Sequence, residues 1–71
     1  MAITIILNGK KEKIKEGINI AGFLQDKKIR PEVVTVELND SIIDRSKYDK
    51  TILKENDKLE FVYYMGGGYA F

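Results

Sequence analysis

The stretch that decides the fold lies close to the C-terminal end and reads Leu59-Glu60-Phe61-Val62-Tyr63-Tyr64-Met65-Gly66-Gly67-Gly68. Odd-numbered and even-numbered residues of 59–64 form two alternating sets, one of them strongly apolar, which predicts a β-strand. Three glycines follow almost at once. Glycine adds nothing to packing and has the largest backbone entropy of any residue. Stability therefore does not explain this run.

Upstream of that strand, the first half of the chain predicts a hairpin and a helix. Residues 3–7 alternate as a strand, Asn8-Gly9 is a strong signal for a type I′ turn, and 11–15 return as a lysine-rich second strand. Asn19 is a plausible N-cap for a helix whose apolar face is formed by Ile20, Phe23 and Leu24. The helix should end before Pro31, because proline disfavours helical geometry in the residue before it.

The second half predicts more strands. Residues 33–38 alternate and are rich in β-branched side chains, Asn39-Asp40 is a turn, and 41–43 form a short returning strand. Residues 44–50 should form a loop with one helical turn, and 55–58 a polar turn before the last strand. The order is therefore ββαβββ.

This order is the arrangement of the β-grasp, or ubiquitin-like, α+β fold. In that fold a mixed sheet of about five strands wraps one helix. The first and last strands are the most apolar, so we expect them to be adjacent, parallel and central. One domain is predicted over residues 1–65, with a flexible glycine-rich tail over 66–71.

Composition excludes several kinds of site. The chain has 71 residues with 12 basic and 11 acidic ones, a net charge of +1, and neither cysteine nor histidine. Thiolate nucleophiles, imidazole bases and zinc fingers are thus excluded, and we expect no catalytic residues, no metal and no bound cofactor. No signal peptide or membrane span is visible, so we expect a cytoplasmic protein that binds neither membrane nor nucleic acid.

The glycine run has two interpretations. It could be a frayed terminus or a cloning remnant, since chain ends are commonly disordered. Alternatively, a tail without Cβ atoms can thread a narrow channel in a partner enzyme. Residues 65–68 span roughly 13–14 Å when extended. That length would carry a terminal carboxylate into another protein's active site.

The whole of residues 1–68 resembles the sulfur carrier family of thiamine biosynthesis, ThiS. The matching features are the opening strand with Asn8-Gly9, the helix after Gly17, the 33–39 strand, the segment with Ile42-Ile43 and Tyr48, the Asn56-Asp57 turn and the tail 61–68.

The resemblance implies both the chemistry and the partners. An E1-like adenylyltransferase of the ThiF type would use ATP to adenylate the carboxylate of Gly68. Sulfur from a cysteine desulfurase or rhodanese would then replace AMP, leaving a thiocarboxylate that thiazole synthase (ThiG type) accepts. Gly66 and Gly67 would be the spacer that threads the partner's channel.

The chain departs from the family pattern after the glycines, because it continues as Tyr69-Ala70-Phe71. While Tyr69 is attached, the carbonyl of Gly68 is an amide and cannot attack ATP. The resemblance therefore implies a pro-form that is cleaved between Gly68 and Tyr69, as JAMM-type metalloproteases do for some carriers of this superfamily.

Partner docking is expected on the exposed face of the sheet near the tail. Tyr64 and Met65 are the leading candidates, with Val62 behind them, because aromatic residues and methionine are enriched at contact surfaces. For Val62, plain core packing is at least as good an interpretation.

Other functions stay open. The small subunit of molybdopterin synthase uses the same glycine chemistry, and carriers for cysteine or secondary-metabolite sulfur are a third option. In another class, a β-grasp module that binds protein or RNA is suggested by six lysines, although acidic residues are interleaved with them. These lysines are Lys10, Lys11, Lys13, Lys15, Lys27 and Lys28.

Overall fold

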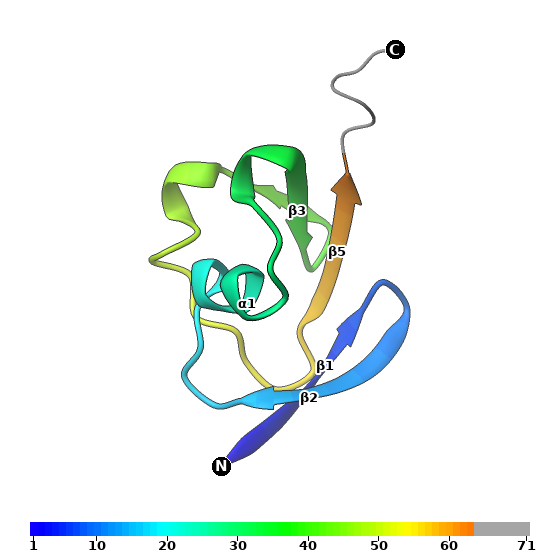
Figure 1. Cartoon of the computed structure of the whole chain (residues 1–71). Helices are drawn as coiled ribbons and strands as arrows, with labels where there is room; N and C mark the ends of the chain where they lie inside the picture. Colours follow the sequence, from blue (N-terminus) through cyan, green and yellow to red (C-terminus); the bar gives the residue numbers. More distant parts are fainter. Residues whose placement is uncertain (64–71) are drawn as a thin grey trace.

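A computed structural model describes residues 1–63 of the chain, and the element order that it shows is the predicted one (Figure 1). Two short 3-10 turns, η1 and η2, are added to the strands and the helix. The elements are β1 (Ala2–Leu7), β2 (Lys10–Lys15), α1 (Ile20–Asp26), η1 (Pro31–Val33), β3 (Val34–Leu38), β4 (Ser41–Ile43), η2 (Arg45–Lys47) and β5 (Lys58–Tyr63).

The five strands form one mixed sheet in the order β2-β1-β5-β3-β4. β1 and β5 run parallel, with Ile6 opposite Lys58 and Leu7 opposite Leu59, and the other neighbours are antiparallel. The first and last strands are thus adjacent, and β5 is central. The predicted β-grasp fold is confirmed.

The core lies between the inner face of this sheet and α1, which sits in the concave side of the sheet (Figure 1). Every strand except the short β4 contributes a buried side chain, and the helix and the segment after β4 add the rest. The buried set is Ile5, Ile14, Ile20, Phe23, Leu24, Val34, Val36, Tyr48, Leu53, Leu59 and Phe61.

The helix begins where the sequence predicted. The side chain of Asn19 accepts a hydrogen bond of 2.6 Å from the backbone N–H of Gly22, and its amide donates to the carbonyl of Asp49 at 3.1 Å. The presence of glycine at position 22 is explained by its close neighbours. A Cβ built there would lie 3.0 Å from Oδ1 of Asn19 and 3.3 Å from Cγ1 of Ile18. Glycine lowers the helix propensity at position 22, but it leaves room for the Asn19 side chain that caps the helix.

The predicted start of β3 was one residue too early. Val33 is the last residue of η1, with its N–H donating to the carbonyl of Arg30 at 3.2 Å, so β3 begins at Val34. Pro31 sets a φ suited to the first position of such a turn, and the turn continues through Val33 before the chain extends. The expected helical turn within 44–50 is confirmed as η2.

Candidate functional site

β5 is the strand that carries the chain toward the glycine run. It lies between β1 and β3, and its residues alternate between the two faces of the sheet. Leu59 and Phe61 point to the helix and are buried, whereas Glu60 and Val62 lie on the outer face. The last described part of the chain is therefore anchored in the core and also presents side chains to solvent.

Two asparagines hold β5 from both sides. Asn8 donates its N–H to the carbonyl of Leu59, and its side-chain oxygen accepts from the N–H of Phe61, both at 2.9 Å. Asn39 exchanges backbone and side-chain hydrogen bonds with Lys58, at 2.7 and 2.9 Å.

Both asparagines have positive φ, of 50° and 52°, a conformation that asparagine tolerates better than most residues. Sequence reasoning recognised them only as turn residues. Their second role is to hold β5 by side-chain hydrogen bonds. The partners are more than fifty residues apart in sequence for Asn8 and nearly twenty for Asn39, so no local pattern reveals these bonds.

The outer face near the end of β5 combines exposed apolar and acidic side chains. Val62 is 52% exposed and Ile42, on β4, is 69% exposed. Between them lie Glu37 and Glu60, which are half-buried and directly opposite each other across β3 and β5. The sequence analysis considered Val62 for this face, whereas Ile42 and the two glutamates were missed, because their juxtaposition depends on strand register.

Lys58 is the cation beside this acidic pair. Its Nζ lies 3.1 Å from Oδ1 of Asp40. That hydrogen bond raises the pKa of the Lys58 ammonium, and the negative charges of Asp40, Glu60 and Glu37 raise it further. Three carboxylates thus act on this single ammonium group.

Most predicted site residues lie outside the described part of the chain. Only Val62 falls within the described residues, and it is exposed rather than packed in the core. The others lie outside residues 1–63: Tyr64, Met65, Gly66, Gly67, Gly68 and Tyr69. The predicted tail over 66–71 likewise lies outside them.

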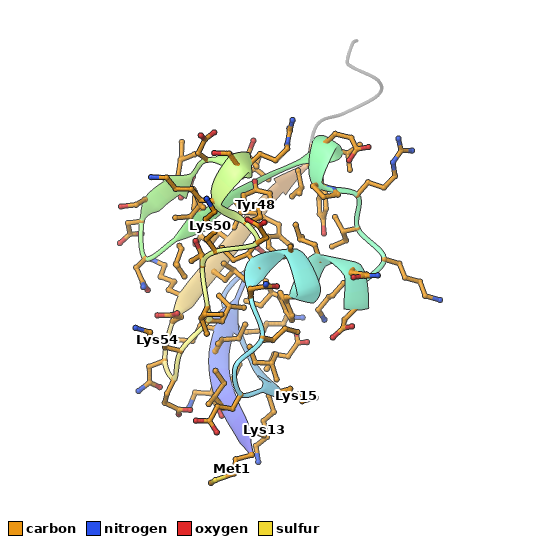
Figure 2. All side chains as sticks on the ribbon, turned by 90° about the vertical axis from the view of Figure 1, so that its left-hand side faces the viewer. Met1, Lys13, Lys15, Tyr48, Lys50 and Lys54 are labelled. Atoms are coloured by element: carbon orange, nitrogen blue, oxygen red, sulfur yellow. The ribbon has the colours of Figure 1, made fainter. Side chains whose placement is uncertain are left out.

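The lysines do not gather into one site. Lys11, Lys13 and Lys15 share the outer face of β2, whereas Lys27 pairs with Glu12 at 2.6 Å and approaches the ring of Phe23. Lys13 and Lys15 lie near Met1, at the opposite end of the molecule from the point where β5 finishes (Figure 2).

The hollow beside Lys11 and Lys13 has an acidic neighbour. It is also lined by Glu55, and no aromatic ring is among the described residues around it. Aromatic platforms are the usual partners of bases in single-stranded nucleic acid. The hollow instead mixes basic and acidic side chains.

Residues 1–63 contain neither a cluster of metal ligands nor a membrane-spanning helix. No group of three or more acidic, histidine or cysteine side chains within residues 1–63 could hold a metal ion. Over the same range no helix is both long and apolar enough to cross a bilayer, since α1 has only 7 residues.

Comparison with known proteins adds a family and several relatives. The model of the ThiS family matches residues 3–68. The sulfur carrier protein ThiS of Bacillus subtilis is 35% identical over 63 residues, covering 87% of this chain and 96% of that protein. A crystal structure of the thiamine biosynthesis protein ThiS from Geobacter metallireducens superposes with a TM-score of 0.81 at 38% identity, covering 93% of this chain and all of that one.

A different kind of relative is much longer. A thiazole synthase of Magnetococcus marinus is 36% identical over 64 residues, which are 90% of this chain but 20% of that protein. A thiazole synthase of Paramagnetospirillum magneticum is 28% identical over the same share. The chain thus spans about a fifth of the length of these two relatives.

Proposed function

The chain belongs to the ThiS family, and from this premise we propose that it is a sulfur carrier which supplies the sulfur of the thiazole ring in thiamine biosynthesis. One observation carries the proposal. The family match ends at residue 68, so it includes all three glycines and stops before Tyr69. The part that is common to the family is then the folded domain plus a tail that ends in glycine.

The chemistry takes place at the main-chain carboxylate of Gly68. A carboxylate oxygen attacks the α-phosphate of ATP on an adenylyltransferase of the ThiF type, pyrophosphate leaves, and an acyl adenylate forms. The outer sulfur of a cysteine persulfide on a desulfurase or rhodanese then attacks the acyl carbon and displaces AMP, and a thiol reduces the S–S bond of the resulting acyl disulfide, becoming a disulfide itself. The product is a thiocarboxylate. The chain acts as a carrier and not as a catalyst, and ATP binds to the partner.

A free carboxylate on Gly68 requires removal of Tyr69-Ala70-Phe71. An amide carbonyl has no ionised oxygen to attack the phosphate, so hydrolysis of the bond between Gly68 and Tyr69 must precede activation. A JAMM-type metalloprotease is the proposed processing enzyme. The end of the family match at residue 68 supports this position of the cleavage.

Thiazole synthase is the proposed acceptor of the sulfur. Two proteins named thiazole synthase contain a segment similar to nearly this whole chain. A carrier domain that is fused to a synthase in one protein and separate in another is expected to meet that enzyme in both cases. The exposed outer face at Val62, together with Tyr64 and Met65, is the proposed contact surface.

Intact-mass analysis of the protein from its native host tests the proposal. The expected species ends at Gly68, and a fraction of it carries the mass increase of one oxygen replaced by sulfur. In a reconstituted reaction with the host adenylyltransferase, ATP and a sulfur donor, the form ending at Gly68 should be converted and the 71-residue chain should not.

A glycine variant provides the matched control. Gly67→Val in the form ending at Gly68 should prevent thiocarboxylate formation through its bulk in the channel, while the unfolding midpoint stays unchanged. A host protein found only at full length with an unmodified Phe71 would contradict the processing step. Full conversion of the valine variant would contradict channel threading.

A further inference from the structure

We infer that an acidic–apolar patch on the outer face, formed by Glu37, Ile42, Glu60 and Val62, docks thiazole synthase by receiving an arginine or lysine of that enzyme between the two glutamates. The inference rests on the proposed function, because it takes the sulfur acceptor as the partner. It adds the chemistry of the contact, which the family match and the sequence do not provide.

Strand register brings the patch together. Glu37 on β3 lies opposite Glu60 on β5 and opposite Ile42 on β4, so these three side chains share one face. Val62 follows Glu60 by two positions and therefore lies on the same face. The patch spans three neighbouring strands and ends at the part of β5 that leads to the glycine run.

The two glutamates share one nearby cation, Lys58, with Asp40. Like charges placed directly opposite each other destabilise a sheet. Within residues 1–63 neither Glu37 nor Glu60 forms an ion pair shorter than 4 Å, although the acids Glu12 and Glu32 both do. Lys58 acts on both glutamates only at longer range, because its ammonium is hydrogen-bonded to Asp40. A glutamine at either position would suit the isolated fold better.

A cation from a partner resolves this repulsion. A guanidinium has several planar donors and can bridge two carboxylates, and such charge-assisted hydrogen bonds are about twice as strong as neutral ones. Half-burial of Glu37 and Glu60 limits competition from water. The acidic centre therefore fits a basic side chain on the synthase.

The apolar members complete the contact. Val62 and Ile42 are more than half exposed; Ile42 lies opposite Glu37 across β3 and β4, and Val62 lies two residues after Glu60 on β5. Apolar contacts that surround a polar centre exclude water from it and strengthen the charge pairing. The partner surface should thus present a cation with apolar side chains around it.

A binding titration between the full chain and the host thiazole synthase tests the inference. Glu37→Gln and Glu60→Gln should each weaken binding by about tenfold, because each leaves the partner's cation half-paired. The same two variants should raise the thermal unfolding midpoint of the free protein by a few degrees, because they remove the like-charge pair.

Glu16→Gln is the matched control. It makes the same chemical change in the turn after β2, beside Met1 and at the far end from the patch. Binding and midpoint should both stay at wild-type values. A nonspecific effect of net charge would instead move all three variants equally.

The outcomes separate the two proposals. If the wild type binds thiazole synthase and the patch variants bind equally well, or bind less well only because they are less stable, the patch inference is wrong and the carrier function stands. If the wild type neither binds the synthase nor acquires a thiocarboxylate after processing, both proposals fail.

Discussion

The inner and outer faces of the sheet differ although the same strands build both. On β5 the inner residues Leu59 and Phe61 are buried against the helix, whereas their immediate neighbours Glu60 and Val62 face solvent. Within residues 1–63 no charged side chain is buried in the core on the inner face, whereas the outer face holds two opposed glutamates. One strand can therefore hold the fold together and carry a contact surface, because alternate residues serve the two tasks.

The comparison also explains how the outer face can tolerate repulsion. β5 is fixed by the core on one side and by hydrogen bonds from Asn8 and Asn39 along its edges. A strand held in this way can bear a like-charge pair whose cost is at most about 1 kcal/mol. Substitutions on the inner face should therefore cause large losses of stability, whereas substitutions on the outer face should mainly change binding.

The largest effect is expected for Phe61→Ala. Phe61 is 8% exposed, and its ring lies 6.0 Å from that of Phe23 and 6.4 Å from that of Tyr63. Removing a buried phenylalanine side chain costs about 3–5 kcal/mol, which approaches the whole stability of a small domain. Urea unfolding followed by circular dichroism measures the loss. A variant that unfolds at nearly the wild-type midpoint would show that the inner face is not the source of stability.

A smaller loss is expected for Asn8→Ala. The change leaves the N–H of Phe61 without its acceptor and places alanine at a φ of 50°. An unsatisfied, partly buried donor costs about 1–3 kcal/mol. Asn8→Asp keeps the acceptor oxygen and the tolerance of positive φ, so it should retain most of the stability in the same urea titration. Equal losses for alanine and aspartate would remove the hydrogen bond as the cause.

Gly22→Ala tests the helix end in a double-mutant cycle with Asn19→Ala. Alone, the new Cβ would crowd Oδ1 of Asn19, and the crowding offsets the gain in helix propensity of about 1 kcal/mol. Without the Asn19 side chain, the same alanine should stabilise the domain. The change in unfolding free energy caused by Gly22→Ala should differ by about 1 kcal/mol between the two backgrounds, which is the contribution of the N-cap. Identical effects in both backgrounds would mean that Gly22 does not serve the cap.

The sequence predicted what local patterns determine. Alternation in residues 59–64 predicted which side chains of β5 share a face, and Asn19 was recognised as the cap. The start of β3 was misplaced by one residue, because Pro31 begins a turn that includes Val33. Register between strands distant in sequence was not accessible. The Glu37–Glu60 pair therefore emerged only from the structure, and so did the role of Asn8 on β5.

The candidate site was predicted less completely than the fold. Its proposed chemistry lies at Gly68, which was inferred from resemblance and lies outside the described residues. Val62 was left between core and contact surface, since it is itself apolar although it belongs to the alternating set that contains Glu60. Exposure of 52% places it on the outer face.

The smallest change in stability is expected for Val62→Thr, which makes the two faces directly comparable. Threonine keeps the shape and β-branching of valine, so at an exposed strand position the free energy of unfolding should stay within about 0.5 kcal/mol of wild type. The same substitution on the inner face, Val36→Thr, buries a hydroxyl at a fully enclosed site and should cost about 1–3 kcal/mol. The effects on binding to thiazole synthase, measured on the folded fraction of each variant, should be in the reverse order. Val62→Thr weakens binding by removing apolar contact from the patch, and Val36→Thr leaves it unchanged. Equal binding by both variants would mean that the outer face does not carry the contact.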